Sequence, residues 1–394
     1  MINKIVIFAA RFVYSFFKLL PTRNKITMIS RQSNEITLDF KLVKDEIEKQ
    51  NNLIEEEIKK VNKKLLEAKN CKKKLKVVVL CHKLEGGVNA KLLEKIKYGF
   101  HMLSQMYNIA TSKVVLLDSY CILISILNHK KSLKVIQMWH SMGTMKKFGY
   151  QILDKEEGSK KEIANIMHMH KNYDYVFASS LSYAQELADG FGCGVEKIRI
   201  FSLPRVDLLT SKEYKQKITK TIEEKYPEIA HKKNILYCPT FRKNESILEK
   251  EIYKMIDEID FEKYNLIIKL HPLSKIEINN NNVIFDKVFS SMDMLFAADY
   301  VISDYSCIIY EAAVLKIPLF FFAFDLHEYL NNRGLTLDYE KEVPGIVSSN
   351  AKEIIEAINK NNYELDLVEK FREKYVTNTE NCTKKIVEFI EGLL

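Results

Sequence analysis

The sequence lacks the motifs that mark several common classes of enzyme. It contains no Gly-x-Gly-x-x-Gly segment, which disfavours a nicotinamide or flavin dinucleotide site. No Asp-x-Asp motif follows a predicted strand, so a metal-dependent nucleotide-sugar site is not indicated. His168 and His170 have no carboxylate or cysteine at ligand spacing. We therefore expect neither a metal nor a cofactor.

Paired cysteines are also missing. Seven cysteines show no Cys-x-x-Cys spacing, which argues against a disulfide or zinc framework and for a reducing compartment. They are Cys71, Cys81, Cys121, Cys193, Cys238, Cys307 and Cys382. Lysine, in contrast, is abundant, and the formal net charge of +8 fits either a solvated surface or an anionic partner such as a phosphopolymer or phospholipid. Nucleic acid is disfavoured, because no basic run is interleaved with aromatic residues.

The chain begins with an apolar stretch that is interrupted by charges. Within Met1–Leu20, the cations Lys4, Arg11 and Lys18 fall seven residues apart on one stripe of a predicted helix. These charges disfavour a transmembrane span, and no small-residue cleavage site supports a secretory signal. We predict that residues 1–21 form an amphipathic helix in the interface of an anionic membrane, with the cations toward the headgroups. The face expected to insert comprises Ile5, Phe12, Phe16, Phe17 and Leu20. The alternative is an ordinary helix packed on the core.

Short apolar strands then alternate with helices, as is typical of parallel sheets with crossover helices. The strands predicted in the first half are 25–31, 77–81, 114–117, 135–138, 175–178 and 198–202. Those predicted in the second half are 235–237, 266–270, 283–285, 300–302 and 319–322. A lysine-rich joint at 211–233 separates the halves. We predict an α/β fold of two facing Rossmann-like domains, residues 22–212 and 213–394, the second including the C-terminal helices.

Polar residues follow four of these strands, at the edge where parallel sheets bind ligands. His140–Gly143 and then Lys146–Gly149 follow strand 135–138, and Pro239–Arg242 follow strand 235–237. His271 and Pro272 follow strand 266–270. Ser303–Ser306 follow strand 300–302, with Glu311 shortly afterwards.

These blocks resemble, in the same order, the signature blocks of the CDP-glycerol glycerophosphotransferase family, the teichoic acid primases and polymerases. The resemblance runs from about Lys25 to Ile358 and includes Arg31-Gln32-Ser33-Asn34 near its start. Many members have His-Gly-Thr-Pro where this chain has His140-Ser141-Met142-Gly143, a difference that bears on acceptor preference more than on activity. The resemblance implies a glycosyltransferase-B arrangement, with the acceptor in the first domain and a CDP-activated donor in the second.

The implied reaction moves glycerol phosphate or ribitol phosphate from CDP-glycerol or CDP-ribitol to a hydroxyl of a lipid-linked teichoic acid or capsule-type polymer, and releases CMP. It would take place at the cytoplasmic face of the cell membrane, with the enzyme bound peripherally. An alcohol nucleophile needs a general base, and His140, at a strand end beside a glycine, is predicted to supply it. His271 is predicted to donate to a phosphate oxygen or to the leaving group.

The other expected site residues fall into a donor group and an acceptor group. The donor phosphates are expected at Thr240, Arg242, Ser303, Asp304 and Ser306, with Arg242 as a bidentate cation and Asp304 as a helix cap. Glu311 is expected at a ribose or cytidine hydroxyl. The acceptor is expected at Arg31, Gly143, Lys146 and Lys147.

Two other functions stay open at this point. One is a nucleotide-sugar glycosyltransferase of the same fold, although no base- and sugar-recognition site is evident. The other is a catalytically inactive polymer-binding protein, which loss of His140, His271 or Arg242 would have signalled; all three are present. The sequence does not distinguish a glycerol from a ribitol donor or a primase from a polymerase, and it leaves a homo-oligomer open.

Overall fold

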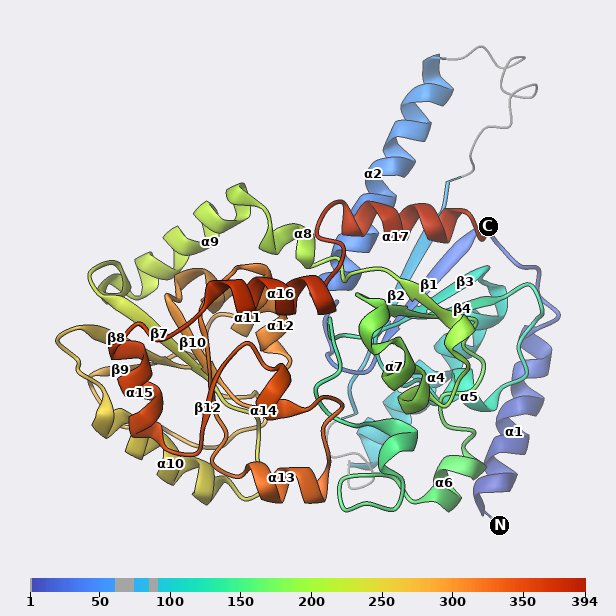
Figure 1. Ribbon diagram of the computed structural model, residues 1–394. Helices are drawn as coiled ribbons and strands as arrows, with labels where there is room; N and C mark the ends of the chain where they lie inside the picture. Colours follow the sequence, from blue (N-terminus) through green and yellow to red (C-terminus); the bar gives the residue numbers. More distant parts are fainter. Residues whose placement is uncertain (1, 61–73, 85–90) are drawn as a thin grey trace.

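The computed structural model describes residues 2–60, 74–84 and 91–394, so Cys71 lies outside the described residues. The chain forms two six-stranded sheets in which every strand pairs parallel with its neighbours, in the orders β2-β1-β3-β4-β5-β6 and β12-β11-β10-β7-β8-β9. Figure 1 shows the two sheets side by side, each flanked by helices. The predicted fold class is therefore confirmed.

The strands agree closely with the predicted ranges. The first sheet comprises β1 (Lys25–Ser30), β2 (Lys76–Cys81), β3 (Val114–Leu117), β4 (Lys134–Gln137), β5 (Tyr175–Ala178) and β6 (Ile198–Ile200). The second comprises β7 (Lys233–Cys238), β8 (Tyr264–Ile268), β9 (Val283–Phe285), β10 (Tyr300–Ser303), β11 (Leu319–Phe322) and β12 (Gly345–Ser348). Central strands such as β3 and β11 are buried along their whole length, which is why they read as continuous apolar runs. Only β12 was not predicted, because its Pro344-Gly345 start is typical of a turn.

Helices cover the sheets and connect the two domains. The first domain contains α1 (Ile2–Phe17), α2 (Leu38–Lys60), α4 (Leu92–Thr111), α5 (Ile122–Ile126), α6 (Lys161–Ile166) and α7 (Ala184–Phe191). The connection consists of α8 (Val206–Leu209) and α9 (Lys212–Lys225). The remaining helices are α10 (Glu245–Glu258), α11 (Ser291–Met294), α12 (Ile308–Val314), α13 (Leu326–Asn332), α14 (Tyr339–Glu342), α15 (Ala351–Asn359), α16 (Leu365–Tyr375) and α17 (Cys382–Glu391).

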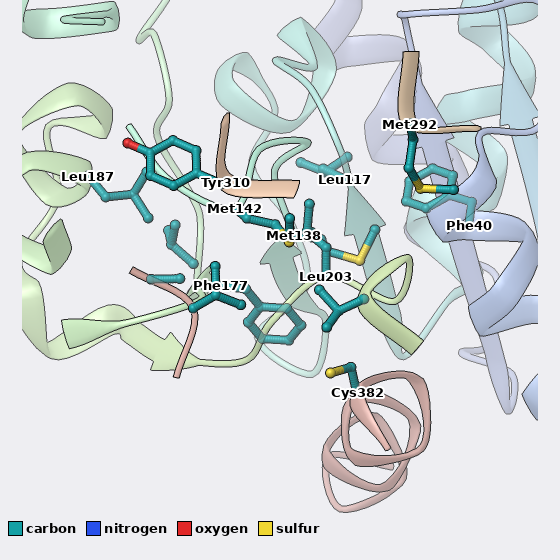
Figure 2. Close-up of a cluster of buried hydrophobic side chains, with 14 of the residues drawn as sticks. Phe40, Leu117, Met138, Met142, Phe177, Leu187, Leu203, Met292, Tyr310 and Cys382 are labelled. Atoms are coloured by element: carbon teal, nitrogen blue, oxygen red, sulfur yellow. The ribbon is translucent and has the colours of Figure 1, made fainter. Parts of the chain in front are cut away.

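One hydrophobic core extends across the boundary between the domains. Figure 2 shows Met292 and Tyr310 of the second domain next to Phe40 and Met142 of the first. Tyr310 is fully buried, and a Cβ atom added to Gly143 would lie 2.3 Å from its ring. Because interiors are packed this densely, the two domains are held in one arrangement by shape as well as by polar contacts.

The last helix packs on the first domain, not on the second. α17 lies against α2, and its Phe389 ring contacts Tyr175, Phe177 and Phe201 near the edge of the first sheet. Its first N–H groups donate to the Asp207 carboxylate at 2.8 Å. This corrects the expectation that all C-terminal helices belong to the second domain, and it means that the chain crosses between domains twice.

The first helix has a packed face and an exposed apolar face. Ile7 and Tyr14 are buried, and the Arg11 Nε donates to the Ile126 carbonyl oxygen at 2.7 Å. Arg11 therefore faces the protein, which contradicts its expected position toward headgroups, and Phe17 also packs on the core. The side chain of Lys4 lies outside what the structure describes. The opposite face exposes Ile5, Phe8, Phe12 and Phe16, and Leu19 is exposed just after the helix.

Candidate active site

A cavity of about 490 Å³ opens at the carboxyl ends of the strands in the second sheet. Thr240 follows β7, His271 follows β8 and Ser306 follows β10, and all three line it. An adjoining cavity of about 520 Å³ shares Lys269, His271 and Pro272 with the first. The predicted strand-end positions of Thr240, His271 and Ser306 thus meet at one place large enough for a nucleotide.

His140 follows β4, at the carboxyl end of that strand in the first sheet, and it is not among the residues that line either cavity. Its Nδ1 is 2.9 Å from the Asp118 carbonyl oxygen. A carbonyl oxygen only accepts, so Nδ1 carries the proton and Nε2 keeps a free lone pair. Burial lowers the pKa of His140 below its ordinary 6.5, and the nearby Arg205 cation acts in the same direction. The imidazole is therefore neutral at neutral pH, with Nε2 able to take a proton.

The turn that presents His140 is strained. Trp139 has φ 67°, in the left-handed region that an aromatic residue rarely adopts. Its N–H donates to the Gln137 side-chain oxygen at 3.0 Å, and its ring stacks on Phe148 at 5.0 Å. These contacts maintain a conformation that costs free energy on its own.

His271 has the opposite tautomer. The Leu273 N–H donates to its Nδ1 at 3.2 Å, so Nδ1 is the acceptor and a neutral ring carries its proton on Nε2. Burial and the Lys146 cation lower the pKa of His271. The two histidines thus differ in what they can do: His140 can accept a proton at Nε2, while His271 can donate a hydrogen bond from Nε2.

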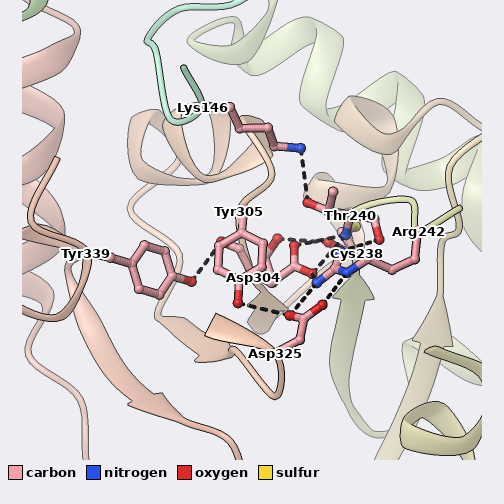
Figure 3. A network of polar contacts seen from close by, with 9 residues as sticks. Lys146, Cys238, Thr240, Arg242, Asp304, Tyr305, Asp325 and Tyr339 are labelled. Atoms are coloured by element: carbon pink, nitrogen blue, oxygen red, sulfur yellow. Dashed lines mark hydrogen bonds and ion pairs between the residues drawn. The ribbon is translucent and has the colours of Figure 1, made fainter. Parts of the chain in front are cut away.

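Arg242 is engaged by carboxylates instead of being free for phosphate. Figure 3 shows its guanidinium between Asp304 and Asp325, with donor–acceptor distances of 2.7 to 2.9 Å to these carboxylates. A further bond to the Thr240 carbonyl oxygen occupies most of the remaining donor capacity. This contradicts the predicted bidentate contact between Arg242 and phosphate. The cluster instead fixes the loop after β7, because the buried Asp304 carboxylate also accepts from the Thr240 N–H.

Three further predicted donor contacts take a different form. Asp304 does not cap α12, whose N-cap is Cys307. Ser303 is fully buried and donates to the Cys238 carbonyl oxygen at 2.8 Å, so it does not reach the cavity. The Glu311 carboxylate accepts from Arg205 Nη1 at 2.9 Å and does not line the cavity. Arg205 also donates through Nε and Nη2 to Asp39, so one cation joins both domains near His140.

Sequence reasoning missed Arg205, although it follows the predicted strand 198–202 and so has the positional signal used for the other site residues.

The predicted acceptor residues make four different kinds of contact. Arg31 lies at the end of β1, where its cation opposes the burial-induced rise in the pKa of Tyr98. Gly143 is packed against Tyr310, which accounts for a glycine there without an acceptor. The Lys147 N–H donates to the Gly334 carbonyl oxygen at 3.2 Å. Lys146, predicted as an acceptor ligand, lines the cavity of the second domain together with Thr240, His271 and Ser306.

Within residues 2–60, 74–84 and 91–394, no group of three histidine, cysteine or acidic side chains is arranged to hold a metal ion.

Comparison with known proteins agrees with this geometry. A sequence model of the CDP-glycerol:poly(glycerophosphate) glycerophosphotransferase family matches residues 14–392. The chain belongs to this family. The predicted family is therefore confirmed, and so is the enzyme class, a transferase that uses a CDP-activated polyol phosphate.

Two curated relatives of this glycerophosphotransferase family member align with it over most of its length and most of their own. A teichoic acid ribitol-phosphate primase of Bacillus spizizenii is 29% identical over 332 residues, covering 81% of this chain and 84% of the relative. A teichoic acid glycerol-phosphate primase of Bacillus subtilis strain 168 is 31% identical over 318 residues, covering 78% and 80%. Among solved structures, the wall teichoic acid polymerase TagF superposes with a TM-score of 0.71 at 17% identity, covering 99% of this chain and 95% of that chain.

Proposed function

We propose that this protein transfers glycerol phosphate or ribitol phosphate from a CDP-linked donor to a hydroxyl of a lipid-linked teichoic acid or capsule-type acceptor. The observation that carries the proposal is the pair of opposite tautomers at His140 and His271. A phosphoryl transfer from a diphosphate to an alcohol needs a proton acceptor for the nucleophile and hydrogen-bond donors for the charged oxygens.

The step follows from these roles. The acceptor oxygen attacks the distal phosphorus of the donor, and its proton passes to Nε2 of His140. The bond between that phosphorus and the bridging oxygen breaks, and CMP leaves with the electron pair. His271 Nε2–H donates to a phosphate oxygen as negative charge develops, and the Thr240 and Ser306 hydroxyls lie in the same cavity. The adjoining cavity provides room for the cytidine.

The membrane surface belongs to the same proposal. α1 exposes Phe8 (72%), Phe12 and Phe16 (58% and 57%), and it packs against α4, which exposes Leu93 (62%) and Phe100 (69%). Exposed lysines accompany these apolar residues: Lys91 just before α4, and Lys95 and Lys97 on it. Large exposed apolar patches mark interaction sites, and apolar residues with nearby lysines suit an anionic bilayer. The part of the chain that the structure describes has no helix long and apolar enough to cross a membrane. We therefore place the enzyme peripherally on the cytoplasmic face of the cell membrane, where a lipid-linked acceptor would be presented.

The test is release of CMP from each donor. Purified protein is incubated with lipid-linked acceptor and CDP-glycerol, CDP-ribitol or a UDP-sugar, and CMP and UDP are measured chromatographically. We expect CMP from a CDP-polyol only when the acceptor is present, and CMP release about a hundred- to ten-thousand-fold slower from His140→Ala. UDP release with no CMP release would reassign the protein to nucleotide-sugar glycosyltransferases.

A further inference from the structure

The loop after His140 reaches out of the first domain and into the cavity of the second. Lys146 forms an antiparallel β-bridge with Leu335, and the Thr336 N–H donates to the Met145 carbonyl oxygen at 3.1 Å. The Thr336 hydroxyl also donates to the Thr144 carbonyl oxygen. Main-chain bonds therefore fix where the Lys146 side chain enters the donor domain.

The Lys146 ammonium ends among the residues that line the cavity. Its Nζ donates to the Thr240 hydroxyl at 3.3 Å (Figure 3). It also lies 5.9 Å from the centre of the Tyr329 ring. His271 and Ser306 line the same cavity. An ammonium has three N–H donors, so this one keeps donor capacity after binding Thr240.

Unlike Arg242 and Lys269, Lys146 has no ion-pair partner among the described residues. Arg242 pairs with Asp304 and Asp325, and Lys269 pairs with Asp286 at 2.7 Å. Burial lowers the pKa of Lys146 to about 8, although Asp304 and Cys307 act in the opposite direction. An anion in the cavity would supply the missing countercharge, and a diphosphate is the anion that the proposed reaction brings there.

We propose that Lys146 is a ligand of the donor diphosphate, supplied by the acceptor domain, so that the donor site is complete only where the two domains meet. This inference rests on the proposed function and replaces the expected acceptor contact. The ammonium would contact phosphate oxygens on the path to CMP and stabilise the charge left on the departing nucleotide. This role of Lys146 also explains why residues 144–147 are bonded to residues 334–336 of the donor domain.

The experiment measures donor binding without acceptor. Isothermal titration calorimetry with CDP-glycerol or CDP-ribitol, whichever supports CMP release, is carried out on wild type, Lys146→Met and Lys130→Met. Methionine keeps an apolar stem of similar length. Lys130 is the matched control, since it is also a partly buried lysine with a lowered pKa, but its Nζ donates to the Leu20 carbonyl oxygen in the first domain.

We expect Lys146→Met to weaken donor binding by about tenfold to a hundredfold, the effect of losing a charge-assisted hydrogen bond, and Lys130→Met to leave it unchanged. The melting temperature of Lys146→Met should equal or exceed that of wild type, because a partly buried, unpaired ammonium is removed. This separates a binding defect from misfolding.

The outcomes that overturn the inference are distinct. A Lys146→Met variant with wild-type donor affinity and a raised KM for acceptor would make Lys146 an acceptor ligand and overturn the inference alone. A wild-type protein that neither binds a CDP-polyol nor releases CMP would overturn the proposed function, and this inference with it.

Discussion

Arg205 and Glu311 form an ion pair across the domain boundary, with 2.9 Å between Nη1 and Oε1. The same guanidinium binds Asp39, whose side chain is 3% exposed. Replacing Arg205 by methionine would leave two buried carboxylates without their cation, and removing one partner of a buried pair costs about 3 to 5 kcal/mol. We expect Arg205→Met to lower the free energy of unfolding by that amount, measured by urea denaturation.

The control for Arg205 is an arginine with exposed partners. Arg372 lies 3.1 Å from Glu373 and 3.8 Å from Glu369, and both glutamates are exposed. Surface pairs contribute about 0 to 1 kcal/mol, so Arg372→Met should unfold close to the wild-type midpoint. Equal midpoints for the Arg205 and Arg372 variants would show that the ion pairs of Arg205 with Asp39 and Glu311 do not hold the domains together.

The role proposed for His140 as general base predicts how kcat/KM depends on pH. Burial lowers the pKa of His140, so the neutral, proton-accepting form is populated through neutral pH and is lost only as pH falls below 6.5. We expect kcat/KM to decline on the acid side of 6.5, and His140→Ala to lower kcat about a hundred- to ten-thousand-fold with donor affinity retained. His231→Ala, at an exposed histidine, is the control. Normal turnover by His140→Ala would remove His140 from the mechanism.

The contact between Gly143 and Tyr310 predicts a packing defect. An added Cβ would lie 2.3 Å from the Tyr310 ring, and overpacking of this kind costs about 1 to 3 kcal/mol. Gly143→Ala should lower the melting temperature, and its effect should shrink in a Tyr310→Leu background, as a double-mutant cycle would measure. Gly99→Ala is the control, because an added Cβ there meets nothing within 4 Å and alanine favours a helix. Additive effects of the two changes would mean that the contact is not tight.

The exposed face of α1 predicts binding to vesicles. Replacing Phe8, Phe12 and Phe16 with serine should abolish sedimentation with phosphatidylglycerol vesicles and lower activity on lipid-linked acceptor, while activity on a soluble acceptor analogue survives. As a control, serine at Leu181, Leu365 and Leu367 removes exposed apolar side chains from other surfaces. Sedimentation of the phenylalanine variant at the wild-type level would assign membrane contact to another surface.

Strand positions could be predicted from this sequence, because strands such as β3 and β11 are short runs that are apolar throughout. The strand-end rule also brought Thr240, His271 and Ser306 to one cavity. It could not tell which polar side chain at a strand end faces inward. Ser303 and Ser306 are three residues apart, yet the first is fully buried and the second lines the cavity.

Contacts between distant segments could not be predicted from spacing. Lys146 follows a strand of the first domain and was assigned to the acceptor for that reason, but its loop is bonded to residues 334–336. Arg242 has the side chain that phosphate prefers, and two aspartates far along the chain neutralise it instead. α1 is amphipathic, as predicted, but Arg11 lies on the face that packs against the protein, where it donates to a backbone carbonyl oxygen.

The position of α17 has a consequence for how the chain is synthesised. This helix covers part of the first domain through Phe389, yet it is made after the whole of the second domain. Domains usually fold in order as they emerge from the ribosome. In this protein, packing of the first domain is completed only after α17 has emerged. Until then, α17 does not cover the hydrophobic surface that it contacts in the folded protein.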